Sequence, residues 1–102
     1  MNDKIIYHIC TVHDWITQEG TNEYLHQSLE SEGFIHCSFK HQINGVLERY
    51  FREQTDLMLL IIDSEKLIND LKVEEAPIGE SFPHIYGPIN KNAIIEVKEW
   101  VK

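Results

Sequence analysis

Three histidines and one tyrosine of this sequence fall in short apolar runs of the kind that form β-strands: His8, His36, His84 and Tyr86. An imidazole in an apolar environment needs a partner on each ring nitrogen, whereas leucine or valine would fill the same space without that cost. Core packing explains any one of these side chains taken alone. Together, three such histidines in 102 residues favour a polar pocket.

The stretch from residue 80 to residue 90 has a defined local shape, because it holds two prolines and a glycine around the triplet His84-Ile85-Tyr86. If the triplet is extended, alternation places His84 and Tyr86 on one face and Ile85 on the other. Two interpretations stay open. The stretch is either a proline-bounded edge strand with its polar face in water, or a strand that presents an imidazole and a phenol to a pocket.

Two earlier strands carry the other candidate residues. In the run 5–10, alternation places His8 on a mostly apolar face, either as a core histidine bonded to a backbone carbonyl or as a pocket residue at the end of the strand. In the run 33–39, His36 and Ser38 share a face that is unusually polar for a short hydrophobic run. A buried histidine beside a buried serine needs hydrogen-bond partners from the protein, from water or from a ligand.

Two chemistries fit such a pocket. In the first, histidine and tyrosine hold a nucleotide or sugar phosphate by hydrogen bonds and stacking, and an acid stabilises a positively charged transition state. In the second, His8, His36 and His84 bind a metal such as zinc and leave one position open. No two of these histidines have a local ligand spacing, and the sequence contains no HExxH, P-loop, GxGxxG or nucleophile-elbow motif.

Hydrophobic periodicity and capping residues predict the elements that must position these side chains. Strands are expected at 5–10, 33–39, 57–62, 71–75, 84–86 and 93–101, and helices between Thr11 and Gly20, at 23–31 and at 41–54. The run 57–62 is apolar on both faces and should be the most buried strand. In the last strand, Ala93, Ile95 and Val97 are expected to face the core. Because helices cluster in the first half and strands in the second, the fold class is α+β with two to three helices.

Length and composition are those of one globular domain spanning residues 1–102, with 42% hydrophobic and 25% charged residues. The net charge of −8 argues against binding to DNA, which depends on lysine and arginine contacts to phosphates. No run is long enough to span a membrane and no signal peptide is evident, so a cytoplasmic location is expected. Cys10 and Cys37 lie in apolar runs and are predicted to be buried thiols. The oligomeric state is left open.

Four motifs, which cover nearly the whole chain, resemble those of the family known as domain of unknown function 952. They are Ile6-Tyr7-His8-Ile9, Glu32-Gly33-Phe34-Ile35-His36-Cys37-Ser38 followed by Gln42, Leu57 to Asp63, and Gly79-Glu80 running into Phe82-Pro83-His84-Ile85-Tyr86-Gly87-Pro88. The resemblance implies a small, mostly bacterial protein without an established reaction. It also implies the wider ADP-ribosyltransferase-like superfold, with a mixed or antiparallel split sheet.

The superfold implies that this sequence forms a pocket for NAD, ADP-ribose or a phosphorylated nucleotide. His8 resembles the residue that bonds the nicotinamide ribose, and His36 with Ser38 resembles the second ligand-binding position. The late glutamate that stabilises an oxocarbenium-like transition state has no clear counterpart. Glu74, Glu80 or Glu96 are candidates, or His84 and Tyr86 take its place.

The sequence therefore predicts two sets of site residues and leaves catalysis open. The predicted catalytic residues are His8, His36, His84 and Glu74, and the predicted ligand-binding residues are Ser38, Gln42, Tyr86 and Asn90. NAD is a possible cofactor, and a transferase activity is one hypothesis. A binding module for a small ligand or peptide without turnover, a histidine metal site and a purely structural role are the others.

Overall fold

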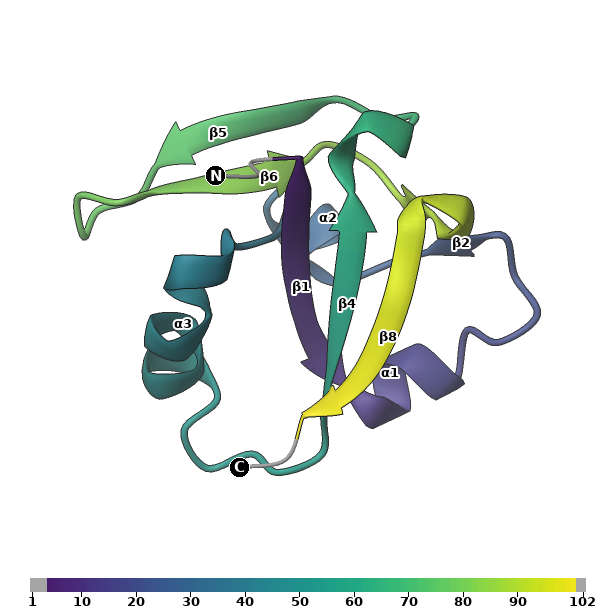
Figure 1. The fold of residues 1–102 in the computed structure, drawn as a ribbon, viewed down its shortest axis with the longest axis horizontal. Helices are drawn as coiled ribbons and strands as arrows, with labels where there is room; N and C mark the ends of the chain where they lie inside the picture. Colours follow the sequence, from purple (N-terminus) through teal and green to yellow (C-terminus); the bar gives the residue numbers. More distant parts are fainter. Residues whose placement is uncertain (1–3, 101–102) are drawn as a thin grey trace.

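The structure is a computed structural model that describes residues 4–100 of the chain (Figure 1). These residues form one α+β domain in which the paired strands are antiparallel. The strands are β1 (Ile5–Thr11), β2 (Glu23–Tyr24), β3 (Ile35–His36), β4 (Leu57–Asp63), β5 (Leu71–Glu75), β6 (Ser81–Ile85), β7 (Ile89–Asn90) and β8 (Ile94–Trp100). The helices are α1 (Val12–Ile16), α2 (Ser28–Ser31) and α3 (Ile43–Tyr50), with 3-10 turns at η1 (Lys40–Gln42), η2 (Ser64–Lys66) and η3 (Lys91–Ala93).

One three-stranded sheet, with the order β1-β4-β8, forms the centre of the molecule (Figure 1). Its middle strand β4 contains the run 57–62 and is buried along most of its length, as predicted. Branched apolar side chains suit this strand because both faces of the sheet are covered. Ile43 and Leu47 of α3 pack in a core cluster on one face, and a second cluster that includes Tyr24 and Ile85 covers the other.

A second three-stranded sheet has the order β3-β6-β5, so β6 is its middle strand. The edge-strand interpretation of residues 80–90 is therefore wrong. Pro83 has no N–H to give to the ladder, but its carbonyl accepts a hydrogen bond from the Cys37 N–H at 3.0 Å. The expected alternation is confirmed, because Ile85 is buried in the core while His84 and Tyr86 both contact the same carboxylate on the opposite face.

The strand predicted at 33–39 is divided between the two sheets. Only β3 pairs with β6, after which Ser38 pairs with Tyr7 of β1 through backbone hydrogen bonds of 2.7 and 2.8 Å. The chain crosses from one sheet to the other between these two pairings. The polar face expected for His36 and Ser38 is consequently split, because His36 is exposed while Ser38 is buried. The crossing places β1, β3 and β6 around a common space.

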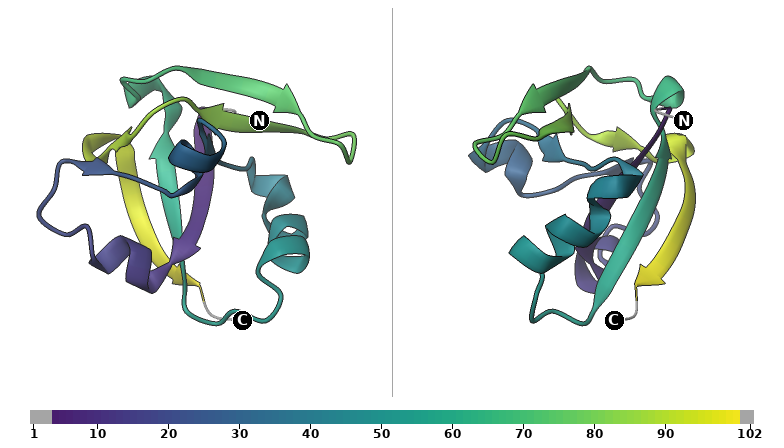
Figure 2. Two further views of the ribbon diagram at one scale, coloured as in Figure 1. Left: turned by 180° about the vertical axis from the view of Figure 1, so that it is seen from behind. Right: turned by 60° about the vertical axis from the view of Figure 1, so that its left-hand side comes forward.

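The helices lie in the first half of the chain, as predicted, but all three are shorter than expected. The Thr11 hydroxyl caps α1 by accepting a hydrogen bond from the Asp14 N–H at 3.0 Å. The helix predicted at 23–31 is wrong in its first half, where β2 pairs with β7 and places Tyr24 in the core. Helix α3 is confirmed within 41–54, and both figures show it on the β1 side of the central sheet, below the β5–β6 hairpin (Figure 2).

The prediction that Ile95 of the last strand faces the core is wrong, because this residue is 51% exposed. Ile95 is left out of the ladder, because adjacent residues of β4 pair with Ile94 and Glu96 on either side of it. This β-bulge reverses the alternation, so that Ile94 packs against the core in place of Ile95. Ala93 is buried and Val97 packs against the core, as expected.

Cys10 and Cys37 are buried free thiols, as predicted. Burial holds the pKa of the Cys10 thiol up at about 11, and the pKa of the Cys37 thiol is raised for the same reason. Neither is therefore a reactive thiolate at neutral pH. Within residues 4–100, none of the helices is long and apolar enough to cross a membrane.

Candidate ligand-binding pocket

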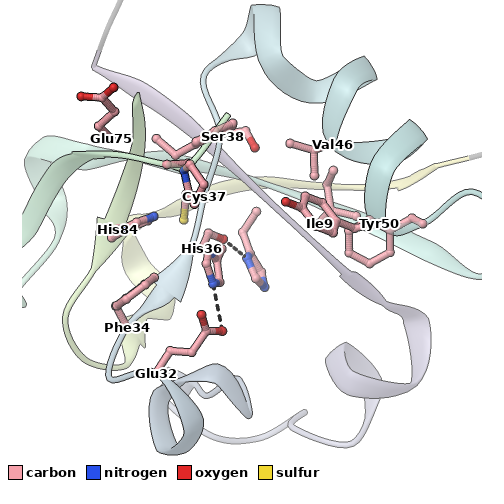
Figure 3. Close-up of a pocket in the computed structure, with 15 residues that line it drawn as sticks. Ile9, Glu32, Phe34, His36, Cys37, Ser38, Val46, Tyr50, Glu75 and His84 are labelled. Atoms are coloured by element: carbon pink, nitrogen blue, oxygen red, sulfur yellow. Dashed lines mark hydrogen bonds and ion pairs between the residues drawn. The ribbon is translucent and has the colours of Figure 1, made fainter. Parts of the chain in front are cut away.

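A cavity of about 620 Å³ lies where β1, β3, α3 and the β5–β6 hairpin meet (Figure 3). The chain crosses from one sheet to the other here, and this crossing leaves the space open, because the residues after β3 turn away from β6 and pair with β1. Its walls combine apolar and aromatic groups with a few polar ones. The lining residues are His8, Ile9, Glu32, Phe34, His36, Cys37, Ser38, Val46, Tyr50, Phe51, Glu75, Ala76, Pro77, Phe82 and His84. Four of the eight predicted site residues are among them.

A carboxylate outside the cavity binds one ring nitrogen of His84. Its Nδ1 lies 2.8 Å from Glu74 Oε1, and the Tyr86 hydroxyl donates a hydrogen bond of 2.5 Å to the same oxygen. Neighbouring strands provide the three groups, since Lys72 is opposite His84 in the β5–β6 register and Glu74 follows two residues later on the same face. Glu74 and Tyr86 do not line the cavity and contact it only through His84.

The hydrogen bonds to Glu74 change the acidity of both partners in a defined direction. The hydrogen bond from Tyr86, and to a smaller extent that from His84, lowers the pKa of the Glu74 carboxyl, because both hydrogen bonds stabilise its ionised form. The same carboxylate raises the pKa of the Tyr86 phenol, since the neutral phenol is the better donor. Glu74 is therefore ionised at neutral pH and can accept a hydrogen bond from His84 Nδ1.

The other ring nitrogen of His84 faces the cavity. His84 is only 8% exposed, and within residues 4–100 its Nε2 has no hydrogen-bond partner. Every fully buried polar side-chain atom of the described chain does have a partner, so Nε2 must reach the open space of the cavity. Phe34 stacks on the ring with centroids 4.0 Å apart and planes 16° apart, which fixes the ring orientation.

Ser38 is a second polar group directed at the cavity. It is only 4% exposed, and its backbone is used by the pairing with β1. Its hydroxyl makes no hydrogen bond to the described part of the chain, and the same argument places it on the cavity surface. A buried hydroxyl without a protein partner is uncommon in folded proteins, and a ligand or water normally satisfies it.

His36 lies across the sheet from His84, with ring centroids 5.2 Å apart in an edge-to-face arrangement. Its Nε2 is 3.0 Å from Glu32 Oε2, and both side chains are about half exposed at the rim of the cavity (Figure 3). Phe34 also contacts His36, with ring centroids 4.8 Å apart, so this aromatic ring touches both imidazoles. The structure thus brings His36 and His84 together as two carboxylate-paired imidazoles.

His8 lines the cavity but has both ring nitrogens engaged by the protein. Nδ1 is 2.6 Å from the His36 carbonyl oxygen and Nε2 is 3.1 Å from the Tyr24 hydroxyl. Because a carbonyl only accepts, Nδ1 carries the proton and Nε2 accepts from Tyr24. Burial lowers the pKa of His8 to about 3, so the ring is neutral. This arrangement is that of a core histidine bonded to a backbone carbonyl, and it leaves no nitrogen for a ribose hydroxyl.

Gln42 and Asn90 lie apart from the cavity. The buried Gln42 amide accepts a hydrogen bond from the Phe39 N–H at 2.9 Å and donates to the Ser81 carbonyl at 2.8 Å, which ties the start of α3 to β6. The buried Asn90 accepts from the Ile68 N–H and donates to the Lys66 carbonyl, on the far side of the fold. Both amides therefore hold backbone segments together, and the structure does not bring them to a common site with the histidines.

The geometry does not favour the metal hypothesis for His8, His36 and His84. The described chain contains no cluster of three histidine, cysteine, aspartate or glutamate residues arranged to hold a metal ion. His8 uses both nitrogens within the protein, and His36 directs its Nε2 at Glu32.

Sequence reasoning missed several residues of the pocket. Phe34, Glu32 and Glu75 line it, and Tyr24 fixes the state of His8. Tyr24 lies in a segment that the sequence predicts to be helical, so alternation could not reveal that it faces His8. Phe34 is the one that a pattern could have found, since alternation within 33–39 places it on the same face as His36.

Comparisons with solved structures found three of one bacterial protein, CC0527 from Caulobacter crescentus. The chain is 29% identical to its crystal structure, with a TM-score of 0.84, covering 93% of this chain and 84% of that one. A double mutant of CC0527 gives 28% identity and a TM-score of 0.83. Its solution structure gives 28% identity and a TM-score of 0.82, covering 96% and 85% of the two chains. The comparison with curated proteins found no match.

The match to a family model extends over most of the fold and includes all the strands that surround the cavity except the first part of β1. The model described as protein of unknown function (DUF952) matches residues 9–97. The chain belongs to this family.

Proposed function

We propose that the protein binds a small organic molecule in this cavity and that His84 exchanges a proton with it. The observation that carries the proposal is the unshared Nε2 of a nearly buried histidine whose Nδ1 is held by the ionised Glu74 carboxylate. The predicted catalytic role of Glu74 changes in consequence. It orients His84 from outside the cavity and does not touch the ligand itself.

The chemistry follows from the hydrogen bonds on each nitrogen. With Nδ1–H donating to Glu74, the neutral ring presents a lone pair on Nε2 and can act as a general base. When Nε2 takes up a proton, the adjacent carboxylate stabilises the resulting imidazolium, which can then act as a general acid. Tyr86 supports both states because it holds the Glu74 carboxylate in place.

The remaining walls indicate how a ligand would lie. Ser38 offers a hydroxyl without a protein partner, and it can donate to or accept from a polar group of the ligand. Phe34, Phe82 and Phe51 offer aromatic surface for an apolar or planar part. A cavity of about 620 Å³ is within the usual range for small-molecule sites, which is roughly 300–1,000 Å³.

The narrower form of this proposal is that the ligand is NAD, ADP-ribose or a phosphorylated nucleotide, which is what the expected ADP-ribosyltransferase-like superfold would imply. The ring and ribose have suitable partners in the aromatic walls and in Ser38. No lysine or arginine between residues 4 and 100 lines the cavity, so phosphate groups would depend on Ser38, His36 and solvent. We therefore expect phosphate-rich ligands to bind more weakly than the corresponding nucleosides.

A second candidate is a binding module without turnover in the same cavity. It is favoured by His8, the best match to a superfold position, since both of its nitrogens are used within the protein. In this form the ligand is held by Ser38 and the aromatic walls, and His84 only accepts or donates a hydrogen bond. The two candidates predict the same binding site and differ in the appearance of product.

The experiment is a titration followed by two-dimensional NMR, with NAD, ADP-ribose, a 2′-phosphorylated oligonucleotide and the matching nucleosides. Binding should shift the signals of Ser38, His84 and Phe34 and leave those near Asn90 unchanged. His84→Gln should retain binding and lose any product detected by mass spectrometry, whereas His13→Gln, on the exposed face of α1, should change neither.

Persistent binding without product would select the binding module. If no member of the panel shifts the cavity signals at millimolar concentration, the nucleotide form of the proposal is rejected.

A further inference from the structure

We infer that the ligand of this cavity carries a positive charge next to a ring or other apolar group, as an aryl- or alkylammonium ion does. The inference rests on the proposed binding of a small organic molecule in the cavity, and it specifies a ligand class other than the phosphorylated nucleotides of the narrower form. It follows from three features of the cavity: an unpaired carboxylate at its mouth, buried hydrogen-bond acceptors inside it and aromatic walls.

The charges that line the cavity are unbalanced. Among residues 4–100, the carboxylates that line it are Glu32 and Glu75, and neither lysine nor arginine is among the lining residues. Glu32 is paired with His36, so that this pair is neutral when His36 is protonated and negative otherwise. His84 is balanced in the same way by Glu74. Within the described part of the chain, Glu75 is left without a counter-charge whether or not these histidines are protonated.

Glu75 is placed at the cavity by the end of β5. It is opposite Ser81 in the β5–β6 register, and the turn after it is closed by backbone hydrogen bonds from the Ala76 N–H to the Glu80 carbonyl at 2.7 Å and from the Gly79 N–H to the Ala76 carbonyl at 2.9 Å. Within residues 4–100, the Glu75 carboxylate makes no ion pair or hydrogen bond. A cationic group at the mouth of the cavity would meet this carboxylate directly.

The buried polar groups are the second, independent observation. Ser38 and His84 are each more than nine-tenths buried, and the Ser38 hydroxyl oxygen and His84 Nε2 face the cavity without protein partners. With Nδ1–H directed at Glu74, Nε2 of the neutral ring can only accept. An ammonium group, which has donors and no acceptor, is suited to this pair, whereas a carboxylate would oppose the Nε2 lone pair.

The aromatic walls favour the same class of ligand. Phe34, Phe82 and Tyr50 line the cavity, and the face of an aromatic ring attracts a cation within about 6 Å by roughly 0.5–2 kcal/mol. Tyr50 is exposed at the end of α3. The Arg49 guanidinium already lies over one face of its ring, 5.8 Å from the centroid, so an entering group can contact only the other face. The net charge of −8 adds a long-range attraction for cations and a repulsion for anions.

Three ligands of similar shape test the effect of ligand charge separately from that of ligand size. Benzylamine, benzyl alcohol and benzoate share a ring and differ in the charge of the attached group at neutral pH. We expect benzylamine to shift the NMR signals of Ser38, His84 and Phe34 with an affinity about fivefold higher than that of benzyl alcohol, and benzoate to bind more weakly still. The measurement is a titration of the full chain at low ionic strength, fitted residue by residue.

Glu75→Gln tests the carboxylate itself. Because Glu75 is exposed and unpaired within the described chain, the variant should fold, and its affinity for benzylamine should fall by about threefold while that for benzyl alcohol stays unchanged. Glu99→Gln, on the exposed side of β8, is the matched control for overall charge and should have no such effect.

The outcomes distinguish this inference from the proposed function. If the three compounds bind with equal affinity, or if Glu75→Gln and Glu99→Gln act alike, the charge inference is wrong and the binding cavity stands. If none of the three shifts the cavity signals while a nucleoside does, the charge inference is wrong and the binding cavity stands. If neither set of compounds shifts them, both are wrong.

Discussion

At the scale of single residues, the two buried histidines have different roles because the partners of their ring nitrogens differ. His8 is bonded on both nitrogens and is held neutral by burial. His84 is bonded on one nitrogen by a carboxylate and presents the other to the cavity. The first histidine joins β1, β2 and β3 through its contacts with Tyr24 and the His36 carbonyl, and the second is the group available for chemistry.

The neutral state of His8 makes stability depend on pH. Its pKa is about 3 in the folded protein and 6.5 in the unfolded chain, so between these values only the unfolded chain binds the proton. The free energy of unfolding should therefore fall as the pH falls below 6.5, by about 1.4 kcal/mol per pH unit from this residue. Urea unfolding measured from pH 7.5 to about pH 5 gives this slope.

His8→Gln should reduce the slope of the unfolding free energy against pH by about 1.4 kcal/mol per pH unit, the contribution of one proton, because glutamine does not titrate. His13→Gln, an exposed surface change, should leave it as in the wild type. An identical slope in wild type and His8→Gln would show that another group causes the acid sensitivity.

Glu74 should control the acidity of Tyr86 directly. Replacing the carboxylate by an amide in Glu74→Gln removes the negative charge that raises the pKa of the phenol, so that pKa should move down toward 10. The chemical shift of the Tyr86 ring carbon followed against pH measures the change. Glu75→Gln serves as the control, because that side chain does not contact Tyr86, and an equal shift in both variants would contradict the assigned hydrogen bond.

At the scale of elements, β6 and the turn after it position the site. Placing β6 between β3 and β5 gives His84 a histidine on one side and a lysine on the other, with the carboxylate two residues along β5. The chain then leaves the strand through Gly87, which has a φ of 149°. Asn69 packs against this glycine and donates a hydrogen bond to the Pro88 carbonyl at 2.7 Å.

Gly87→Ala should therefore destabilise the fold strongly. A Cβ at this position would lie 2.6 Å from Asn69 Cγ, and the backbone conformation is unfavourable for alanine. We expect a loss of about 2–4 kcal/mol in the free energy of unfolding. Gly79→Ala is the matched control, because it also has a positive φ but has open space around it, and it should cost about 1 kcal/mol. Equal losses would show that the contact with Asn69 has no cost.

At the scale of the whole molecule, the cavity exists because two antiparallel sheets meet at the β1–β3 crossing. Its walls come from segments that are far apart in the sequence, and α3 closes the side that the β5–β6 hairpin leaves open (Figures 1 and 3). The whole chain carries an excess of acidic side chains, with 17 aspartate and glutamate residues against 9 lysine and arginine residues.

This excess of negative charge should make the fold more stable in salt. Like charges repel across the surface, and ions screen that repulsion over about 10 Å at 0.1 M ionic strength. The melting temperature at neutral pH should therefore rise between low and moderate sodium chloride. Glu99→Lys, which reduces the excess on the exposed side of β8, should raise the melting temperature at low salt and weaken its dependence on salt. A melting temperature that falls with salt would show that local ion pairs, such as Lys4–Asp63, dominate.

The sequence by itself determined the features that depend on neighbouring residues along the chain. Alternation placed His84 and Tyr86 together and Ile85 opposite, and apolar residues on both faces identified β4 as the buried strand. Thr11 and Asp14 identified the start of α1. These features follow from local geometry, because the period of a strand and the reach of a capping side chain are the same in any fold.

Only the tertiary structure decided which histidine is free to act. The partners that occupy both nitrogens of His8 lie 16 and 28 residues away, and Glu74 lies 10 residues from His84 on another strand. The bulge at Ile95 and the crossing after β3 also depend on pairing between distant strands. Hydrogen-bond partners and strand register are set by segments that meet only on folding. The residue types therefore indicated a polar pocket, while the fold determined which nitrogen faces it.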